Sequence, residues 1–251
     1  MYQFFVDPGA ISEKQVVITG KDVNHIKNVL RMKVGEEIAV SNGVDGREYR
    51  CGILQMTEDA VICELRFIKE DGVELPSKIY LFQGLPKADK MELIIQKAVE
   101  LGAYEIIPVA TKRTVVKLDA KKEKSKLVRW QAISEAAAKQ SKRAVIPQVH
   151  SVMSFAHALA YADMLDVRLI PYEMAEDMAK TRSLIEEIRP GQSIGIFIGP
   201  EGGFAPEEIE QAMAHATQPI TLGKRILRTE TAGMTVLSIL MYTLEGQELK
   251  A

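Results

Sequence analysis

Residues 198–208 read Ile198-Gly199-Pro200-Glu201-Gly202-Gly203-Phe204-Ala205-Pro206-Glu207-Glu208. An apolar strand enters a glycine-rich turn, and Pro206 with two acids opens a helix, as expected at the carboxyl edge of a parallel sheet, where ligands bind. Glycines let backbone amides approach a ligand there, although a tight turn that needs positive φ explains them equally well. A dinucleotide fingerprint is missing, because Phe82-Gln83-Gly84-Leu85-Pro86-Lys87 stands where Gly-x-Gly-x-x-Gly would follow the first strand.

The chain on either side of this turn, from residue 73 to residue 251, alternates between apolar strands and helices. We expect strands near 79–82, 105–109, 167–171, 193–198 and 219–222, and helices near 88–101, 122–141, 175–188, 206–216 and from 229 onward. Strands that are apolar on both faces and separated by helices predict an α/β domain with a mostly parallel sheet covered on both sides.

Residues 1–72 follow a different rhythm, with apolar residues at every second position. The alternation predicts strands near 15–18, 37–40, 48–54 and 60–67, which together indicate a small β-barrel domain. One helix interrupts them, with Asp22 as its expected N-cap and with Val23, Ile26, Val29 and Leu30 on one face. The polar stretch Glu70–Ser77 reads as a linker to the second domain.

Residues 222–233 form a second motif, Leu222-Gly223-Lys224-Arg225-Ile226-Leu227-Arg228-Thr229-Glu230-Thr231-Ala232-Gly233. A strand ends at a glycine, and a short loop enters a helix at Thr229, a residue type that favours the start of a helix whatever its other role. Arg228 lies at the positive end of that helix, where a cation is disfavoured unless an anion or Glu230 compensates it.

Length and composition limit the number of domains and the cell compartment that the chain suits. The chain has 251 residues, 47% hydrophobic and 26% charged, which suits one large globular domain or two unequal ones. The two cysteines, Cys51 and Cys63, lie in apolar stretches and read as small buried side chains in a reducing compartment. Neither a signal peptide nor an apolar run of membrane-spanning length is visible, so we expect a cytoplasmic protein without a membrane partner.

The net charge of -2 conceals a basic segment between Thr111 and Arg143, which holds eleven Lys and Arg residues against three acids. Such a segment on an otherwise acidic chain suits a contact with a polyanion, whose binding depends on neutralised phosphates. A solvated lysine-rich helix explains the same pattern and is the more common case.

Together, the Gly-Pro-Glu-Gly-Gly-Phe and Leu-Gly-x-x-Ile-Leu-Arg-Thr-Glu-Thr-Ala motifs resemble the SPOUT class of knotted methyltransferases, and within it the 16S ribosomal RNA (uracil-N3) methyltransferase family RsmE. The resemblance extends over the whole chain, through the segments His25–Arg31 with Gly35, Lys87, Gln96–Gly102 and Glu135–Arg143. It implies a PUA-like RNA-binding barrel at 1–72, a SPOUT methyltransferase domain at 73–251 with a deep carboxy-terminal trefoil knot, and a homodimer with each cofactor site close to the partner subunit.

The cofactor implied by the resemblance is S-adenosylmethionine, held by three strand-end loops whose glycine and apolar residues suit an adenine ring. The implied cofactor-binding residues are Pro171, Tyr172, Ile198, Gly199, Pro200, Glu201, Gly202, Leu222, Gly223, Ile226 and Leu227. No metal is required, and the four scattered histidines lack the spacing of a metal site.

The implied substrate is 16S rRNA or the small ribosomal subunit, methylated at N3 of a uridine. That nitrogen carries a proton and lies on the pairing edge, so the base must be unpaired or flipped out. We assign Arg228 as the donor to the negative charge that forms, with Glu201 or Glu230 orienting it or helping the proton leave; the sequence leaves open which carboxylate is the base. His25, Arg31, Lys87 and Arg143 are expected RNA contacts.

Two other classes of protein fit parts of this pattern. The alternative is a non-catalytic RNA-binding ribosome-assembly factor with a vestigial cofactor pocket, and the completeness of the pocket motifs speaks against it. A Rossmann-type enzyme is disfavoured by the missing glycine fingerprint.

Overall fold

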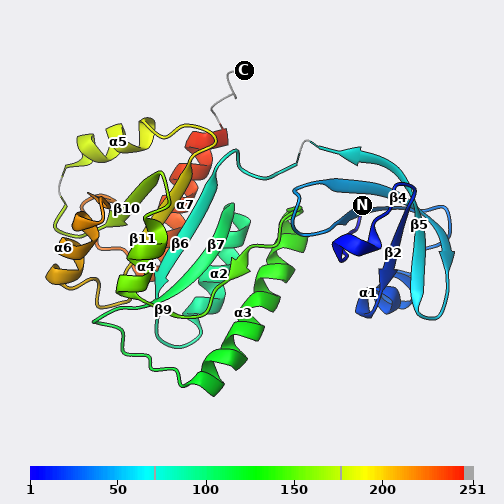
Figure 1. Cartoon of the computed structure of the whole chain (residues 1–251), viewed down its shortest axis with the longest axis horizontal. Coiled ribbons are helices and arrows are strands. Elements are labelled where there is room, and N and C mark those ends of the chain that lie inside the picture. The colour runs from blue at the N-terminus through cyan, green and yellow to red at the C-terminus, as the bar shows by residue number, and fades with distance from the viewer. Residues whose placement is uncertain (71, 176, 246–251) are drawn as a thin grey trace. The chain divides into compact units, whose positions relative to one another are not determined.

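The computed structural model describes residues 1–70, 72–175 and 177–245, which divide into two compact units (Figure 1). The first contains Met1–Glu74 together with Ala138–Ile146, and the second contains Leu75–Ala137 and the chain from Pro147 onward. The sequence predicted a division near residue 72. Nothing in its pattern indicated that residues 138–146 return to the amino-terminal unit.

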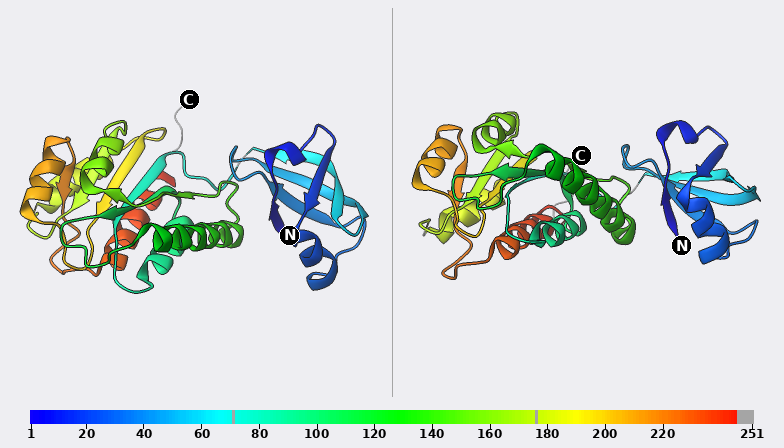
Figure 2. Two further views of the ribbon diagram at one scale, coloured as in Figure 1. Left: turned by 60° about the horizontal axis from the view of Figure 1, so that its bottom comes forward. Right: turned by 90° about the horizontal axis from the view of Figure 1, so that it is seen from below.

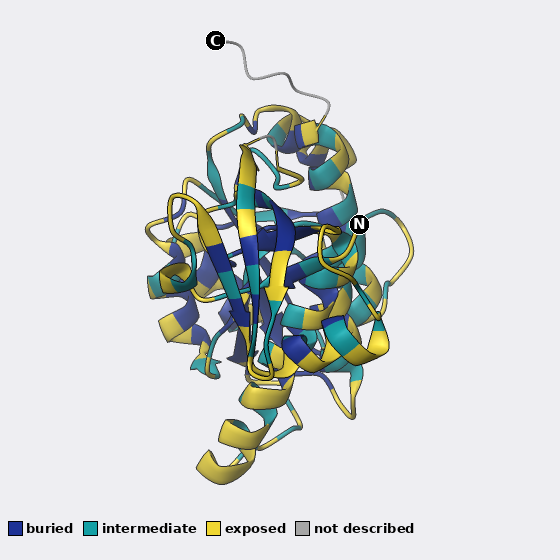
Figure 3. Cartoon of the chain, turned by 90° about the vertical axis from the view of Figure 1, so that its right-hand side faces the viewer, coloured by how far each residue is buried: buried dark blue, intermediate teal, exposed yellow. Residues whose placement is uncertain are grey.

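The first unit is built on a curled five-stranded sheet with the order β1-β3-β4-β5-β2; the alternating pattern predicted four of these strands, and β1 was not predicted. Its strands are β1 (Gln3–Phe5), β2 (Gln15–Thr19), β3 (Glu37–Ser41), β4 (Glu48–Met56) and β5 (Ala60–Lys69), all antiparallel neighbours except the parallel pair β1 and β3. Alternate side chains enter the core, and buried and exposed positions follow one another along the strands (Figure 3). Cys51 and Cys63 are buried and unbridged, as predicted.

The helix in this unit differs from the prediction. It begins after Gly20, whose φ of 71° sets the entry, and Asp22 lies inside α1 (Lys21–Asn24) and not at its cap. The chain then widens into a π-helical turn, His25–Val29. Because a π turn bonds residues five apart, the apolar stripe rotates: Val23 and Ile26 are buried, whereas Val29 is 61% exposed.

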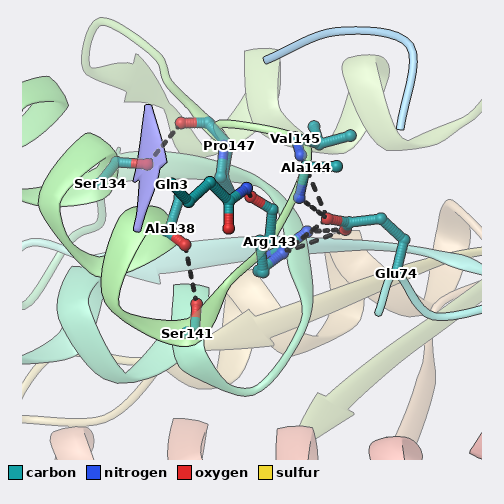
Figure 4. A network of polar contacts seen from close by, with 9 residues as sticks. All are labelled: Gln3, Glu74, Ser134, Ala138, Ser141, Arg143, Ala144, Val145 and Pro147. Carbon is teal, nitrogen blue, oxygen red and sulfur yellow. Dashed lines mark hydrogen bonds and ion pairs between the residues drawn. The ribbon is translucent and has the colours of Figure 1, made fainter. Parts of the chain in front are cut away.

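Residues 138–146 are fastened to the first unit through the linker residue Glu74 (Figure 4). The Arg143 guanidinium donates to the Glu74 carboxylate at 3.0 and 2.6 Å, and the N–H groups of Ala144 and Val145 donate to the same carboxylate at 3.1 and 3.2 Å. The Gln3 amide donates to the Arg143 carbonyl at 2.9 Å. One carboxylate therefore joins the end of the linker to a distant segment of the chain.

The second unit is an α/β domain with a wholly parallel sheet in the order β12-β10-β11-β6-β7-β8, with β9 also pairing with β7. The predicted strands are present as β6 (Lys78–Gly84), β7 (Ala103–Ala110), β10 (Val167–Pro171), β11 (Ser193–Ile198) and β12 (Gln218–Ile220). The predicted helices are present as α2 (Lys90–Glu100), α3 (Ala120–Ser141), α5 (Met178–Glu186), α6 (Pro206–Ala214) and α7 (Thr229–Glu245). Three elements were not predicted: β8 (Gln148–Val149), β9 (Met153–Ser154) and α4 (Phe155–Ala162).

Helices cover both faces of this sheet, as predicted. On one face, α4 and α6 pack over aromatic residues of the central strands, including Phe82 and Phe197, whose rings stack 4.3 Å apart. On the other face, α2 and α7 lie side by side (Figure 2). Both of these helices begin at the carboxyl edge of the sheet, which is the edge that forms the site. Within the described residues, no helix is long and apolar enough to cross a membrane.

Candidate functional site

A pocket of about 460 Å³ opens at the carboxyl edge of the parallel sheet of the second unit. Three loops form its walls: the loop after β10, the glycine-rich loop after β11, and the loop from β12 into α7. Every residue predicted to bind the cofactor lines this pocket, namely Pro171, Tyr172, Ile198, Gly199, Pro200, Glu201, Gly202, Leu222, Gly223, Ile226 and Leu227. Ile226 stands on the rim, since it is 86% exposed.

The glycines of the pocket have more than one role. A Cβ on Gly199 would meet the backbone of Gly203 at 3.1 Å, so this glycine is required by the packing of its own loop. Gly223 has a φ of 104°, which favours glycine whatever surrounds it. Positive φ therefore explains Gly223, and also Gly203 in the glycine-rich turn (φ 67°), but not Gly199, which is restricted by its close approach to Gly203.

Gly84, at the end of β6, belongs to the site although the sequence did not single it out. A Cβ at this position would lie 2.7 Å from the backbone nitrogen of Pro200 and 3.0 Å from the carbonyl carbon of Gly199. The signal was present in Phe82-Gln83-Gly84, which was read only for the absence of a dinucleotide motif. In the structure, β6 and the glycine-rich loop approach each other closely because Gly84 has no side chain.

A buried hydrogen-bond chain joins the three parts of the site. The amide of Gln83, which is fully buried, donates to the Thr229 hydroxyl at 2.8 Å, and that hydroxyl donates to the Gly199 carbonyl at 2.6 Å. Thr229 opens α7, as predicted, but its hydroxyl is committed to the glycine-rich loop. The end of β6, the loop after β11 and the start of α7 are thereby held in one arrangement.

The two candidate carboxylates both hold Lys90, a residue that sequence analysis missed. The Lys90 ammonium lies 3.0 Å from Glu201 and 3.4 Å from Glu230. Glu201 also accepts from the Lys87 N–H at 3.1 and 3.3 Å. Partial burial would by itself raise the pKa of Glu201, but backbone N–H groups and the Lys90 ammonium outweigh it and hold the pKa below its usual value.

Arg228 lines the pocket and is exposed. Within the described residues, no hydrogen bond or ion pair joins its guanidinium to Glu201, Glu230 or another acid, so the expected orienting contact is not formed. Lys224 and Arg225 line the same wall and likewise have no acidic partner in the described part of the chain. The wall from β12 to α7 is thus rich in unpaired positive charge.

The residues predicted to contact RNA are not gathered in one place. Lys87 is exposed and follows β6, close to the pocket through its bond to Glu201. His25 and Arg31 are exposed in the first unit, on the π turn and just after it, where Arg31 has a φ of 53°. Arg143 is the exception, because it is only 4% exposed and its guanidinium is occupied by Glu74. We therefore withdraw it as an RNA contact.

The basic segment divides into a loop and a helix. In the loop, the Arg113 guanidinium donates to the Gly202 carbonyl at 2.8 Å, and the Lys112 N–H donates to Glu208 at 2.7 Å, which ties the loop to the glycine-rich turn. Along α3, Arg129 pairs with Glu92 at 2.6 Å and Lys126 lies 3.6 Å from Asp89. Lys121 and Lys124 are exposed and have no acidic partner in the described residues.

Among residues 1–70, 72–175 and 177–245, no group of three or more His, Cys, Asp or Glu side chains is placed to hold a metal ion. The nearest approach to a cluster is His150, whose ring nitrogen lies 2.8 Å from Glu105, beside the Tyr161 hydroxyl. These side chains are on β7, α4 and the residue after β8, away from the pocket residues.

Comparison with known proteins identifies the family. Residues 73–241 match the RNA methyltransferase domain model, and residues 18–66 match the RNA methyltransferase PUA domain model. The chain is 40% identical to ribosomal RNA small subunit methyltransferase E of Bacillus subtilis over 231 residues, which cover 91% of this chain and 90% of that protein. This chain belongs to the ribosomal RNA small subunit methyltransferase E family.

Solved structures agree with this assignment. The crystal structure of ribosomal RNA small subunit methyltransferase E from Neisseria gonorrhoeae, bound to S-adenosylmethionine, matches with a TM-score of 0.81 and 31% identity, over 96% of this chain and 97% of that chain. A methyltransferase from Legionella pneumophila in complex with the same cofactor matches with a TM-score of 0.80 and 30% identity, over 96% of both chains. The predicted family and the predicted mixed α/β fold are thereby confirmed.

Proposed function

We propose that this methyltransferase transfers the methyl group of S-adenosylmethionine to N3 of a uridine in 16S rRNA. The observation that carries the proposal is the pocket at the carboxyl edge of the parallel sheet, which gathers every predicted cofactor residue together with Arg228. The family and the cofactor-bound relatives support a methyl transfer to ribosomal RNA.

The residues of the pocket fit the cofactor. A pocket of about 460 Å³ is in the range of sites for ligands of this size, and Ile198, Leu222 and Leu227 offer apolar walls for an adenine ring. Without side chains at Gly199 and Gly223, a ligand can approach the loop backbone closely along those walls; the Gly199 carbonyl is taken by the Thr229 hydroxyl and the Gly223 N–H by the Thr221 hydroxyl. When bound, S-adenosylmethionine supplies an electrophilic methyl group; the protein has to place and prepare the base.

Preparing the base means removing a proton from N3 and stabilising the charge that spreads onto the uracil oxygens. Arg228 is exposed, unpaired and adjacent to the start of α7, so its guanidinium is free to donate to such an oxygen. Glu201 is a poor base, because its pKa is held low and its oxygens are occupied by Lys87 and Lys90. We therefore favour proton loss to solvent or to Glu230 over proton transfer to Glu201.

The remaining assignments follow from the resemblance and the exposed cations. We assign RNA contacts to His25 and Arg31 in the PUA-like unit and to Lys87 in the methyltransferase unit. A cytoplasmic location fits an enzyme that works on ribosomal RNA. The trefoil knot is proposed from the family resemblance alone. The homodimer is likewise proposed from the family resemblance, and Ile226 (86% exposed) and Tyr242 (82% exposed) are apolar side chains that a partner subunit could cover. Light scattering that gives the mass of a single chain at micromolar concentration would contradict the dimer.

The decisive experiment is mass spectrometry of nucleosides from 16S rRNA of cells with and without the gene, followed by methylation of the unmodified RNA with the purified protein. We expect 3-methyluridine to disappear without the gene and to return with the protein and S-adenosylmethionine. Calorimetry with S-adenosylmethionine, NAD and ATP tests the pocket, and only the first should bind. Unchanged 3-methyluridine, with RNA binding retained, would favour the non-catalytic assembly factor.

A further inference from the structure

Lys90 is the first residue of α2, and its side chain lines the cofactor pocket. Its ammonium lies between two carboxylates, 3.0 Å from Glu201 and 3.4 Å from Glu230, and the side chain is 28% exposed. Glu201 comes from the glycine-rich loop and Glu230 from the first turn of α7. Three separate elements therefore meet at one ammonium group that faces the pocket.

The position is electrostatically unusual. The N-terminus of a helix carries partial positive charge, so a lysine at the first helical residue is disfavoured unless anions compensate it. Arg228 stands in the same situation one residue before α7, and α2 packs against α7. Two helix N-termini and two cations thus border the pocket, where they would attract an anionic group of a ligand, although Glu201 and Glu230 already balance part of this charge.

The ammonium remains a proton donor. Its hydrogen bond to Glu201, with the attraction of both carboxylates, raises the pKa of Lys90 above its usual value despite partial burial. A lysine ammonium has three N–H donors, and the described residues supply two acceptors, Glu201 and Glu230. One N–H is left for a group in the pocket.

We propose that Lys90 is a ligand-contacting cation of this active site, which donates to an anionic oxygen of the bound reactants while contacts with Glu201 and Glu230 hold its ammonium in place. The proposal rests on the proposed function of the pocket. Two oxygens have the required chemistry: the carboxylate of S-adenosylmethionine, and a uracil oxygen that gains charge as the N3 proton leaves. A purely structural role, in which Lys90 only joins α2 to the two loops, is the competing explanation.

The test compares Lys90→Met with Lys97→Met in the full-length protein. Lys97 lies two turns further along the same helix and pairs with Glu100 at 2.7 Å, so its removal deletes an ion pair without touching the pocket. For each variant we would measure Tm, the Kd for S-adenosylmethionine and for its demethylated product by calorimetry, and the single-turnover rate at saturating cofactor. Lys90→Arg would be added to ask whether charge alone restores the effect.

We expect Lys90→Met to match Lys97→Met in Tm. Either both of its Kd values should rise or its single-turnover rate should fall by about tenfold to a hundredfold, the scale of one hydrogen bond to a charged group. A loss in both Kd values identifies the cofactor carboxylate, and a loss in single-turnover rate at unchanged Kd identifies the uracil oxygen. Partial recovery in Lys90→Arg would support either case.

Two results would overturn the proposal. One is Kd values and rates within twofold of those of Lys97→Met; the other is a fall in Tm that accounts for the loss of binding and is not rescued by arginine. A wild-type protein that binds no S-adenosylmethionine would overturn the proposed function and this inference together. A wild type that methylates rRNA, with Lys90→Met equal to its control, would overturn the inference alone.

Discussion

Arg228 is the residue of this site that is best suited to stabilise a negative charge in the transition state. It follows Leu227 in the loop from β12 and precedes the helix that opens at Thr229, and no acid of the described residues neutralises it. A cation held at a helix N-terminus gains most when a negative charge forms in front of it. A uracil that is losing its N3 proton provides that charge, so the benefit of Arg228 should fall mainly in the transition state.

We expect Arg228→Ala to fold, to bind S-adenosylmethionine with little change, and to lose turnover by on the order of a hundredfold, the scale of removing one oxyanion donor. Arg228→Lys keeps the charge but not the planar guanidinium, so its turnover should lie between those of the wild type and Arg228→Ala. Single-turnover kinetics at saturating cofactor measure the effect, with Arg182→Ala on the exposed face of α5 as control. Weaker cofactor affinity with a normal single-turnover rate would reassign Arg228 to cofactor binding.

Glu201 is expected to act through position and charge. Because its folded pKa lies below its ordinary value, the carboxylate stabilises the fold at pH 7 and this contribution is lost as the pH falls through the folded pKa. Glu201→Gln should cost about 1 kcal/mol at pH 7, and the difference from wild type should shrink below about pH 4.5. Urea unfolding across pH 3 to 7 tests this, with Glu100→Gln as control. A difference that does not depend on pH would show that the charge of Glu201 is not what matters.

At the scale of single residues, the sequence predicts site residues that lie in contiguous motifs. It misses residues whose role depends on an ion-pair partner far away in the sequence. The predicted pocket residues come from three strand-end loops. Lys90 lies in none of them, and only the argument applied to Arg228, a cation at a helix N-terminus, would have indicated it. Arg143 was misread for the same reason, since its partner Glu74 lies 69 positions away.

At the scale of elements, the contact between β6 and the glycine-rich loop decides whether the pocket forms. A Cβ at Gly84 would lie 2.7 Å from the Pro200 nitrogen, so Gly84→Ala must push the loop away from the strand. We expect at least a tenfold weaker affinity for S-adenosylmethionine, since displacing packed backbone costs on the order of 1–3 kcal/mol. Gly9→Ala is the control, because a Cβ there meets nothing within 4 Å. Equal calorimetric affinities for the two variants would show that the loop adapts.

The helix α3 offers a test of RNA binding. Lys121 and Lys124 are exposed without acidic partners in the described residues, whereas Lys122 and Lys126 lie 3.4 and 3.6 Å from Asp119 and Asp89. If α3 binds phosphates, replacing the first pair by glutamine should reduce the slope of log Kd against log salt by about 0.7 for each phosphate that is no longer neutralised, and the second pair should change it less. Fluorescence anisotropy with an rRNA fragment measures both slopes. Unchanged slopes in both double variants would show that these lysines of α3 do not bind RNA phosphates and are only solvated.

Element boundaries show where pattern reading stops. Strands and helices of the second unit were predicted because apolar runs and helical stripes are long there. The π turn at His25–Val29 was not predicted, because a helical pattern assumes a constant number of residues per turn. The wider turn directs Val29 outward. The helix α4 was missed because Phe155–Ala162 spans only eight residues and is apolar at every position except His157, so residue type hardly distinguishes its buried face from its exposed face.

At the scale of the whole molecule, the chain leaves its first unit at Glu74 and returns to it at Ala138–Ile146. No local pattern predicts such a return, because it depends on a pairing between distant residues. The pairing is the Glu74 carboxylate with the Arg143 guanidinium and the N–H groups of Ala144 and Val145. The first unit is therefore complete only when residues 138–146 are present.

This pairing gives the last prediction. The Arg143 side chain is 5% exposed and that of Glu74 is 23% exposed, so Glu74→Gln removes one charged partner from a buried cation. We expect a loss of about 2–4 kcal/mol in the free energy of unfolding, on the scale measured when one partner of a buried pair is removed. Arg143→Met alone should cost less than Glu74→Gln, because it leaves the more exposed carboxylate, which can reach water. The double variant Glu74→Gln/Arg143→Met should be more stable than Glu74→Gln alone, since it no longer buries the cation whose carboxylate partner has been removed. Calorimetric affinity for S-adenosylmethionine should stay unchanged in all three, because every lining residue of the pocket belongs to the second unit. Additive losses in the double variant would show that the two charges do not depend on each other, and the fastening of residues 138–146 would then rest on Gln3 and the backbone contacts.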